Sequence, residues 1–227
     1  MKPFYLIATP IGNLEDITYR AVRMMSEVDV ILCEDTRLTK RLLNYYKIET
    51  ATESYNAHST VSKEDSIIRR VGEGIVFGMV SDAGTPTISD PGVKLISRLY
   101  RDVSDVDIIS LPGPSALITA LSATGFTGNQ FTFYGFLPHK KGRNKIFEEI
   151  FDSTRIAIFY ESPHRLIKTL EFLQEQYKDS HRKMCVAREL TKIYEQKVIG
   201  SAEYLYRYFQ DHPEKVRGEC VILIDKK

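Results

Sequence analysis

The first half of the chain alternates short apolar segments with amphipathic ones, and this alternation restricts the possible folds more than any other feature. Runs rich in β-branched and aromatic residues, which are typical of strands, occupy residues 4–8, 28–33, 75–80 and 106–111. The segments between them have the apolar spacing of helices and occupy residues 17–26, 38–46, 61–71 and 93–100. Strands that alternate with helices form a mostly parallel sheet covered by helices. The first half is therefore predicted to be an α/β domain.

The pattern changes after residue 114. An apolar helix is predicted at residues 115–124, followed by an aromatic run and then a basic stretch. Further strands are predicted at 156–160, 184–187, 194–199 and 219–224, and helices at 164–177 and 202–210. Some of these strands are joined by short connections, which favours a mixed sheet. We predict two α/β domains, residues 1–114 with a mostly parallel sheet and residues 115–227 with a mixed sheet.

Composition limits the compartment and the chemistry. The chain has 227 residues, 43% of them hydrophobic, which is enough for one or two compact cores. Its three cysteines, Cys33, Cys185 and Cys220, are odd in number and widely spaced, which argues against a disulfide framework or a cysteine metal site. No apolar segment reaches the length of a membrane span or a signal peptide. We expect a soluble cytoplasmic protein with no metal site.

Four predicted strands are followed by unusual loops, at residues 9–14, 34–37, 81–92 and 111–116. In a parallel sheet these loops meet at one edge, where open α/β sheets bind ligands. The loop at 81–92 contains two glycines, two prolines and two aspartates. Asp90 precedes Pro91 and a helical pattern, so it is predicted to cap that helix, whereas Asp82 is expected to face a ligand.

The motifs that the chain lacks and the residues that these four loops contain indicate the type of ligand. Neither the phosphate-binding G-x-x-x-x-G-K-[ST] pattern nor the dinucleotide G-x-G-x-x-G pattern occurs. The loops instead offer backbone amides and carbonyls beside small side chains. This favours a flat, amide-rich or adenine-bearing ligand.

Charge is distributed unevenly although the formal net charge is only +1. No acidic residue lies between Asp107 and Glu148, and this window contains the basic side chains of Lys140, Lys141, Arg143 and Lys145. A loop with this composition is predicted to contact nucleic-acid phosphates, since each neutralised phosphate releases counterions. The nearby aromatic residues 131, 133, 134 and 136 could stack on bases, but strand core is the preferred interpretation.

Several blocks together resemble the ribosomal RNA small subunit methyltransferase I family. They are Thr-Pro-Ile-Gly-Asn-Leu at 9–14, Glu-Asp-Thr-Arg at 34–37, Ser-Asp-Ala-Gly-Thr-Pro at 81–86, Leu-Pro-Gly-Pro-Ser-Ala at 111–116 and Gly-Phe-Leu-Pro at 135–138. Later blocks follow in order, at residues 160–165, 187–192 and 218–219. The resemblance implies a tetrapyrrole-methylase-like fold, with S-adenosylmethionine in a cleft between two α/β domains, and a homodimer. It also implies methylation of the ribose 2′-hydroxyl of a cytidine in 16S ribosomal RNA.

The resemblance assigns cofactor contacts to three groups of residues. The first domain would contribute Ile11, Asp82, Ala83, Gly84 and Thr85. Ser115 and Ala116 would lie at the domain junction. The second domain would contribute Tyr160, Ala187 and Gly218. The last three rest on the resemblance alone, because spacing gives no reason to choose them.

The sequence also offers candidates for catalysis and for substrate binding. A ribose hydroxyl gains from a nearby general base, and Glu34 and Asp35 are the candidates. The alternative is that they form structural ion pairs with Arg37 or Arg41. The residues predicted to bind the RNA substrate are Arg37, Lys140, Lys141, Arg143 and Arg165.

Two other functions compete with RNA methylation. The same scaffold serves small-molecule methyltransferases that act on tetrapyrroles, and fold alone does not choose between the two. The chain could also be a non-catalytic RNA-binding protein of ribosome assembly, although the presence of every cleft loop argues against this.

Overall fold

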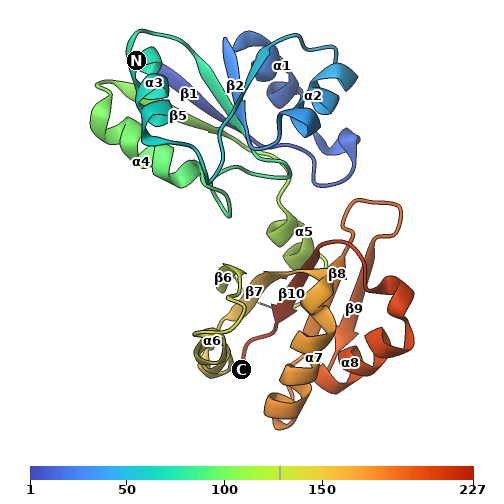
Figure 1. The fold of residues 1–227 in the computed structure, drawn as a ribbon. Coiled ribbons are helices and arrows are strands. Elements are labelled where there is room, and N and C mark those ends of the chain that lie inside the picture. The colour runs from blue at the N-terminus through green and yellow to red at the C-terminus, as the bar shows by residue number, and fades with distance from the viewer. Residues whose placement is uncertain (128) are drawn as a thin grey trace. The chain divides into compact units, whose positions relative to one another are not determined.

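The computed structural model describes residues 1–127 and 129–227 (Figure 1). Within it the chain forms two compact units, Met1–Ser115 and Ala116–Lys227. The division falls one residue after the domain boundary predicted from the sequence. Each unit has its own sheet and its own core.

The first unit is built on a five-stranded parallel sheet, as predicted. In space the strands follow the order β3-β2-β4-β1-β5. Their bounds are Lys2–Ile7 for β1, Val30–Cys33 for β2, Ala51–Ser54 for β3, Phe77–Val80 for β4 and Val106–Leu111 for β5. The edge strand β3 was not predicted, because the sequence Ala-Thr-Glu-Ser has no apolar run.

Helices cover both faces of this sheet (Figure 1). One core packs α1 (Tyr19–Glu27) and α2 (Thr36–Tyr45) on one face, and the other packs α3 (Val61–Gly72) and α4 (Gly92–Asp102) on the opposite face. Strands β1 and β4 are neighbours, yet β1 leads to α1 and β4 leads to α4. Adjacent strands whose connections leave toward opposite faces open a crevice at their carboxyl ends.

The second unit contains the predicted mixed sheet, in the order β6-β7-β10-β8-β9. Its strands are β6 (Phe131–Phe136), β7 (Ile156–Glu161), β8 (Met184–Arg188), β9 (Gln196–Gly200) and β10 (Cys220–Ile224). Strand β6 pairs parallel to β7, whereas the remaining pairs are antiparallel.

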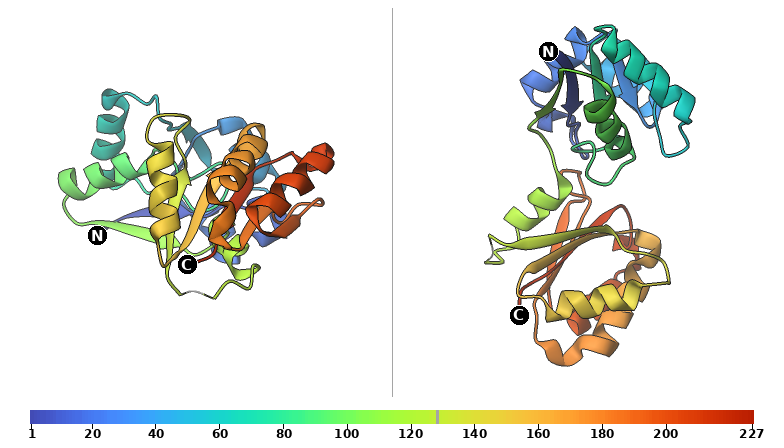
Figure 2. Two further views of the ribbon diagram at one scale, coloured as in Figure 1. Left: turned by 90° about the horizontal axis from the view of Figure 1, so that it is seen from below. Right: turned by 90° about the vertical axis from the view of Figure 1, so that its left-hand side faces the viewer.

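One face of the second sheet carries the larger core. It packs against α6 (Arg143–Asp152), α7 (Pro163–Tyr177) and α8 (Ala202–Asp211), while α5 (Ala116–Ser122) contacts β10 (Figure 2). Helix α6 was not predicted. It begins at Arg143, inside the basic stretch that the sequence had suggested to be a loop. Short 3-10 turns complete the chain at Leu14–Asp16, Lys178–Ser180 and Pro213–Lys215.

The three cysteines, Cys33, Cys185 and Cys220, are buried and unpaired. Burial raises the pKa of the Cys185 and Cys220 thiols to about 12, and it raises the pKa of Cys33 as well. None of the helices in residues 1–127 and 129–227 is long and apolar enough to cross a membrane.

Candidate functional site

The loops that follow β1 and β4 are joined by backbone hydrogen bonds. Thr9 and Gly84 exchange two of them, each 3.0 Å between nitrogen and oxygen. The Thr9 hydroxyl also donates to the carbonyl of Ser81, at 3.0 Å. These bonds fix the start of the loop at 81–92 against the first loop of the chain.

The loop that follows β5 joins the same assembly. The hydroxyl of Thr85 donates to the carbonyl of Pro114 at 3.1 Å. A Cβ on Gly113 would lie 2.6 Å from the Cβ of Ala8, so only glycine allows this approach. Gly84 has φ +84°, and a Cβ there would lie 3.3 Å from Ile11. Ile11, Gly84 and Thr85, which the resemblance had singled out, therefore lie together.

The two aspartates of the loop at 81–92 have different partners. Asp82 accepts a hydrogen bond from the backbone amide of Asp35 at 3.1 Å, which ties the loop after β2 to the other three. Asp90 accepts from the amides of Thr87 at 2.7 Å and Gly92 at 2.9 Å. Since Gly92 is the first residue of α4, Asp90 satisfies the first backbone amide of this helix, although the N-cap residue itself is Pro91.

Glu34 and Asp35 also differ in their surroundings. Asp35 forms hydrogen bonds with the backbone and guanidinium of Arg37, and these lower the pKa of its carboxyl to about 2. Glu34 has no hydrogen-bond or ion-pair partner for its side chain among the described residues. Burial, together with the charges of Asp82 and Asp90, raises the pKa of Glu34. The ion-pair interpretation therefore applies to Asp35 and not to Glu34.

A pocket of about 280 Å³ lies in the first unit beside these loops. One wall is a stripe of α2 formed by Leu38, Arg41, Leu42 and Tyr45, and the rest comes from residues 9–14 and from Ser81 and Asp82. This pocket was not predicted from the sequence, although the spacing i, i+3, i+4, i+7 along α2 already placed these four side chains on one face. Arg41, a possible ion-pair partner of Glu34 or Asp35, has no such partner among the described residues.

In the second unit, two predicted cofactor residues lie on the two strands that flank β10. Tyr160 of β7 and Ala187 of β8 both pair with Val221 of β10. The ring of Tyr160 also lies against Phe133 and Phe136, with ring centroids 5.0 and 5.3 Å away. Ala116, the first residue of α5, belongs to the same unit, and Ser115 ends the other.

Gly218, the third of these residues, precedes β10 with φ +71°. A Cβ at this position would overlap the carboxylate of Glu189. The positive φ favours glycine here, whereas the carboxylate of Glu189 is the end of a flexible side chain that can move.

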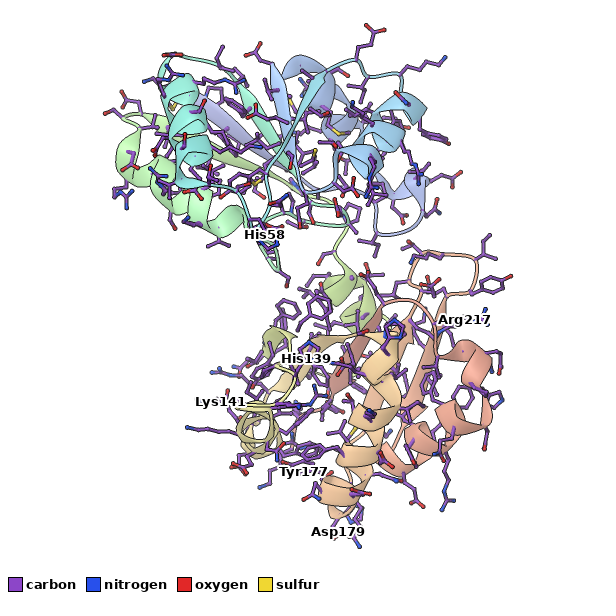
Figure 3. All side chains as sticks on the ribbon, viewed as in Figure 1. His58, His139, Lys141, Tyr177, Asp179 and Arg217 are labelled. Atoms are coloured by element: carbon purple, nitrogen blue, oxygen red, sulfur yellow. The ribbon has the colours of Figure 1, made fainter. Side chains whose placement is uncertain are left out.

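The basic stretch divides into exposed lysines and a half-buried arginine. Lys140, Lys141 and Lys145 are exposed, and Figure 3 shows Lys141 in the second unit near the start of α6. Arg143 is different. Its guanidinium donates to Glu161 at 3.0 Å and to the hydroxyl of Thr169 at 2.6 Å.

Arg165 binds the same carboxylate. Its Nε donates to Glu161 at 2.6 Å and its Nη2 donates to the carbonyl of Leu137 at 3.0 Å. Glu161 is fully buried, and although burial opposes its ionisation, hydrogen bonds from Arg165, Thr169 and Arg143 lower its pKa. The guanidinium groups of Arg143 and Arg165 neutralise Glu161 inside the second unit, and a contact of these two residues with RNA stays a prediction.

The other side chains considered for RNA contact are more exposed to solvent. The side chain of Arg37 is 85% exposed, even though it pairs with Asp35. Phe131 and Phe136 are also exposed, at 38% and 55%, so the preference for strand core was wrong for these two rings. Phe133 and Tyr134 are partly buried, in line with that preference.

Among solved structures, the chain resembles a uroporphyrin-III C-methyltransferase from Thermus thermophilus that is complexed with S-adenosylhomocysteine. The TM-score is 0.66, and the match covers 98% of this chain and 97% of the other. At 16% identity the likeness concerns the fold, and it confirms the predicted tetrapyrrole-methylase architecture.

Proteins of similar sequence identify the family more specifically than the fold does. The ribosomal RNA small subunit methyltransferase I of Thermotoga maritima is 40% identical over 227 residues, which is 100% of each chain. The protein of the same name from Bacillus subtilis is 41% identical over 99% of this chain and 75% of its own length. The model of the tetrapyrrole (corrin/porphyrin) methylases matches residues 3–205. The chain therefore belongs to the tetrapyrrole methylases and, within them, to the ribosomal RNA small subunit methyltransferase I family.

Proposed function

We propose that this chain transfers a methyl group from S-adenosylmethionine to the ribose 2′-hydroxyl of a cytidine in the 16S RNA of the small ribosomal subunit. The observation that carries this proposal is the 40% identity, over the whole chain, to a relative named for methylation of that RNA. The cofactor supplies an electrophilic methyl group on a sulfonium, which leaves readily when a nucleophile attacks in line.

The first unit has groups suited to this cofactor. Among the described residues, the backbone amides of Ile11, Gly12 and Ala83 donate no hydrogen bond within the chain, so they can bind the polar groups of a ligand. Asp82 uses one carboxylate oxygen for the amide of Asp35 and is exposed. Gly84 allows the loops after β4, β1 and β5 to approach closely, since a Cβ there would lie 3.3 Å from Ile11 and 3.5 Å from the carbonyl of Pro114.

Further cofactor contacts remain predictions from the resemblance. In the first unit they are Thr85, whose hydroxyl is bonded to Pro114, and Ser115. In the second unit they are Ala116, Tyr160, Ala187 and Gly218. The homodimer and the cytoplasmic location are proposed on the same ground, as the assembly and compartment in which the enzyme meets ribosomal RNA.

We assign the role of general base to Glu34 rather than Asp35. The proton of the ribose hydroxyl would pass to a carboxylate oxygen of Glu34, which has no partner among the described residues and a raised pKa. Asp35, with its pKa of about 2 and its pairing to Arg37, is a weaker base. A well-placed general base contributes roughly 10² to 10⁴ in rate.

RNA would be held by exposed basic side chains of both units. Lys140, Lys141 and Lys145 of the second unit lie in the acid-free window and are exposed. Arg37 of the first unit lies at the start of α2 and is 85% exposed. Each contact to a phosphate adds affinity that falls as salt rises.

The test is methyl incorporation from labelled S-adenosylmethionine into three acceptors: small ribosomal subunits, isolated 16S RNA and a tetrapyrrole precursor. We expect incorporation into the subunit or its RNA, at a cytidine ribose. Incorporation into the tetrapyrrole alone would replace the proposal by small-molecule methylation. If calorimetry detects no binding of S-adenosylmethionine, the chain is a non-catalytic RNA-binding protein.

A further inference from the structure

We propose that the pocket beside α2 in the first unit binds the base of the nucleotide that is methylated. This inference rests on the proposed function and adds the part of the chain that recognises the acceptor. The pocket, which we call the α2 pocket, is lined by Thr9, Pro10, Gly12, Leu14, Leu38, Thr39, Arg41, Leu42, Tyr45, Ser81 and Asp82. The wall on α2 was not among the predicted site residues, apart from Arg41 as an ion-pair partner.

The position of the α2 pocket suits an acceptor. In the sheet order β2-β4-β1-β5, the pocket lies over the loops after β1 and β4 and extends toward α2, which follows β2. The loops proposed for the cofactor lie over β4, β1 and β5, where Gly84 approaches Ile11 and Pro114. The two regions share the loops after β1 and β4 and extend to opposite sides of them. Methyl transfer requires donor and acceptor atoms about 3 to 3.5 Å apart, so adjacent sites are needed.

The walls of the α2 pocket suit a flat heterocycle. Leu38 and Leu42 supply an apolar surface, and Leu14 faces the pocket from the first loop of the chain. Tyr45 lies one turn beyond Arg41, its side chain is exposed, and its ring contacts that of Tyr46 edge to face at 4.9 Å. An exposed aromatic ring at the mouth of a pocket is the usual platform on which single-stranded bases stack.

One guanidinium group and one hydroxyl group provide the hydrogen bonds. Arg41 has no hydrogen-bond or ion-pair partner among the described residues, and its guanidinium can only donate. The hydroxyl of Ser81, another residue of the pocket wall, donates to the carbonyl of Ala83 at 3.3 Å and can accept a hydrogen bond. Cytosine carries an amino donor beside ring-nitrogen and carbonyl acceptors, so it matches one acceptor and one donor.

The size of the pocket limits what can enter. A volume of about 280 Å³ lies at the lower end of the range of small-molecule sites, roughly 300 to 1,000 Å³. This volume is of the size of one nucleoside. The RNA must therefore present its target base unstacked, as enzymes that act on single nucleotides require.

The experiment compares variants of the full chain in the methylation assay with small subunits, together with the cofactor affinity measured by calorimetry. Tyr45→Ala is expected to raise KM for the RNA substrate by roughly tenfold, as for loss of one base–aromatic stack. Tyr45→Phe keeps the ring and is expected to restore KM. Arg41→Ala is also expected to raise KM, and cofactor affinity stays unchanged in all three.

Matched controls separate this effect from general changes at the surface. Tyr100 is 63% exposed on α4, so Tyr100→Ala removes a similar ring from the other face of the same sheet. Arg69 is exposed on α3, so Arg69→Ala removes the same charge as Arg41→Ala. Both controls are expected to keep the wild-type KM.

Three results would overturn the inference. A Tyr45→Ala chain that folds and keeps the wild-type KM would show that no base stacks there. Loss of cofactor affinity in Tyr45→Ala or Arg41→Ala would assign the α2 pocket to the cofactor. A wild-type chain that methylates no RNA would overturn the proposed function as well, and this distinguishes the two failures.

Discussion

Glu34 and Asp35 are neighbours with the same functional group, yet their surroundings give them different chemistry. Replacement of Glu34 by Gln keeps the shape of the side chain and removes the proton acceptor. We expect kcat for RNA methylation to fall by roughly 10² to 10⁴, with little change in cofactor affinity. Asp35→Asn is the matched control, because Asn still caps α2, and it is expected to reduce kcat much less.

The pH dependence gives a second test of Glu34. Its pKa in the folded chain lies above the ordinary value of 4.5, because of burial and the charges of Asp82 and Asp90. The wild-type kcat should fall as the pH drops through this raised pKa, since Glu34 must be ionised to accept a proton. The inflection should be absent in Glu34→Gln, and an unchanged profile in that variant would remove Glu34 from the reaction.

The raised pKa also makes a prediction about stability. A carboxyl group whose pKa is raised by folding destabilises the folded state when it is ionised. This loss of stability is fully present above the pKa of the folded state and disappears below the pKa of the unfolded state. Glu34→Gln should therefore unfold at higher denaturant than the wild type near pH 7, and the difference should shrink as the pH falls below 4.5. Urea titrations at several pH values measure this.

Gly84 gives a residue-scale test of the cofactor loop. Valine there would need φ near +84° and would press on Ile11, and Asp82→Ala would remove the carboxylate beside it. We expect the double variant Asp82→Ala/Gly84→Val to fold and to lose cofactor binding in calorimetry. Gly72→Val is the control, because a Cβ at Gly72 meets nothing within 4 Å. Unchanged affinity in a folded double variant would remove the loop from the cofactor site.

At the scale of elements, α6 and α7 are tied to β7 through one buried carboxylate. Arg143 begins α6, Arg165 lies in α7, and both bind Glu161 at the end of β7. Removal of one partner from a buried ion pair leaves an uncompensated charge and costs about 3 to 5 kcal/mol. Because Arg165 still pairs with Glu161 in Arg143→Ala, this variant is expected to lower the free energy of unfolding by less than this range, as measured by chemical denaturation.

The exposed lysines beside α6 should behave in the opposite way. Lys140→Ala, Lys141→Ala and Lys145→Ala combined should leave stability nearly unchanged and weaken RNA binding. Each lysine that neutralises one phosphate contributes roughly 0.7 to 0.9 to the slope of log affinity against log salt, so the slope should flatten. A control with Lys178, Lys226 and Lys227 changed to Ala loses the same charge from other exposed positions. Equal slopes for the two variants would make the stretch an ordinary solvated turn.

Elements with a clear apolar period were predictable from the sequence, and the others were not. Strands β1, β2, β4 and β5 contain apolar runs, whereas β3 is a short polar edge strand that only its pairing with β2 defines. Helix α6 was missed because its first turn is basic and its apolar residues, Phe147 and Ile150, follow later.

Charged site residues were harder to predict than loops. The convergence of four loops follows from parallel topology alone, and it was predicted. The partners of Arg143 were not predicted, because Glu161 lies 18 residues away in the sequence and the pairing depends on tertiary packing.

At the scale of the whole molecule, the two units have separate cores. Leu99 of α4 is fully buried in the first unit and Leu170 of α7 is fully buried in the second. Leu→Ala at either position should cost about 2 to 5 kcal/mol. We expect scanning calorimetry to show that each variant lowers mainly the transition of its own unit. Equal displacement of the whole heat-capacity profile by both variants would show that the units unfold as one.

The burial of all three thiols has a practical consequence for such experiments. Alkylating reagents attack the thiolate, and the folded chain keeps Cys185 and Cys220 protonated far above neutral pH, with Cys33 also shielded. A single cysteine introduced by Lys141→Cys or Tyr100→Cys should therefore react alone with a maleimide dye. Native cysteines need no replacement, and fluorescence from one defined position can follow RNA binding in the otherwise wild-type protein.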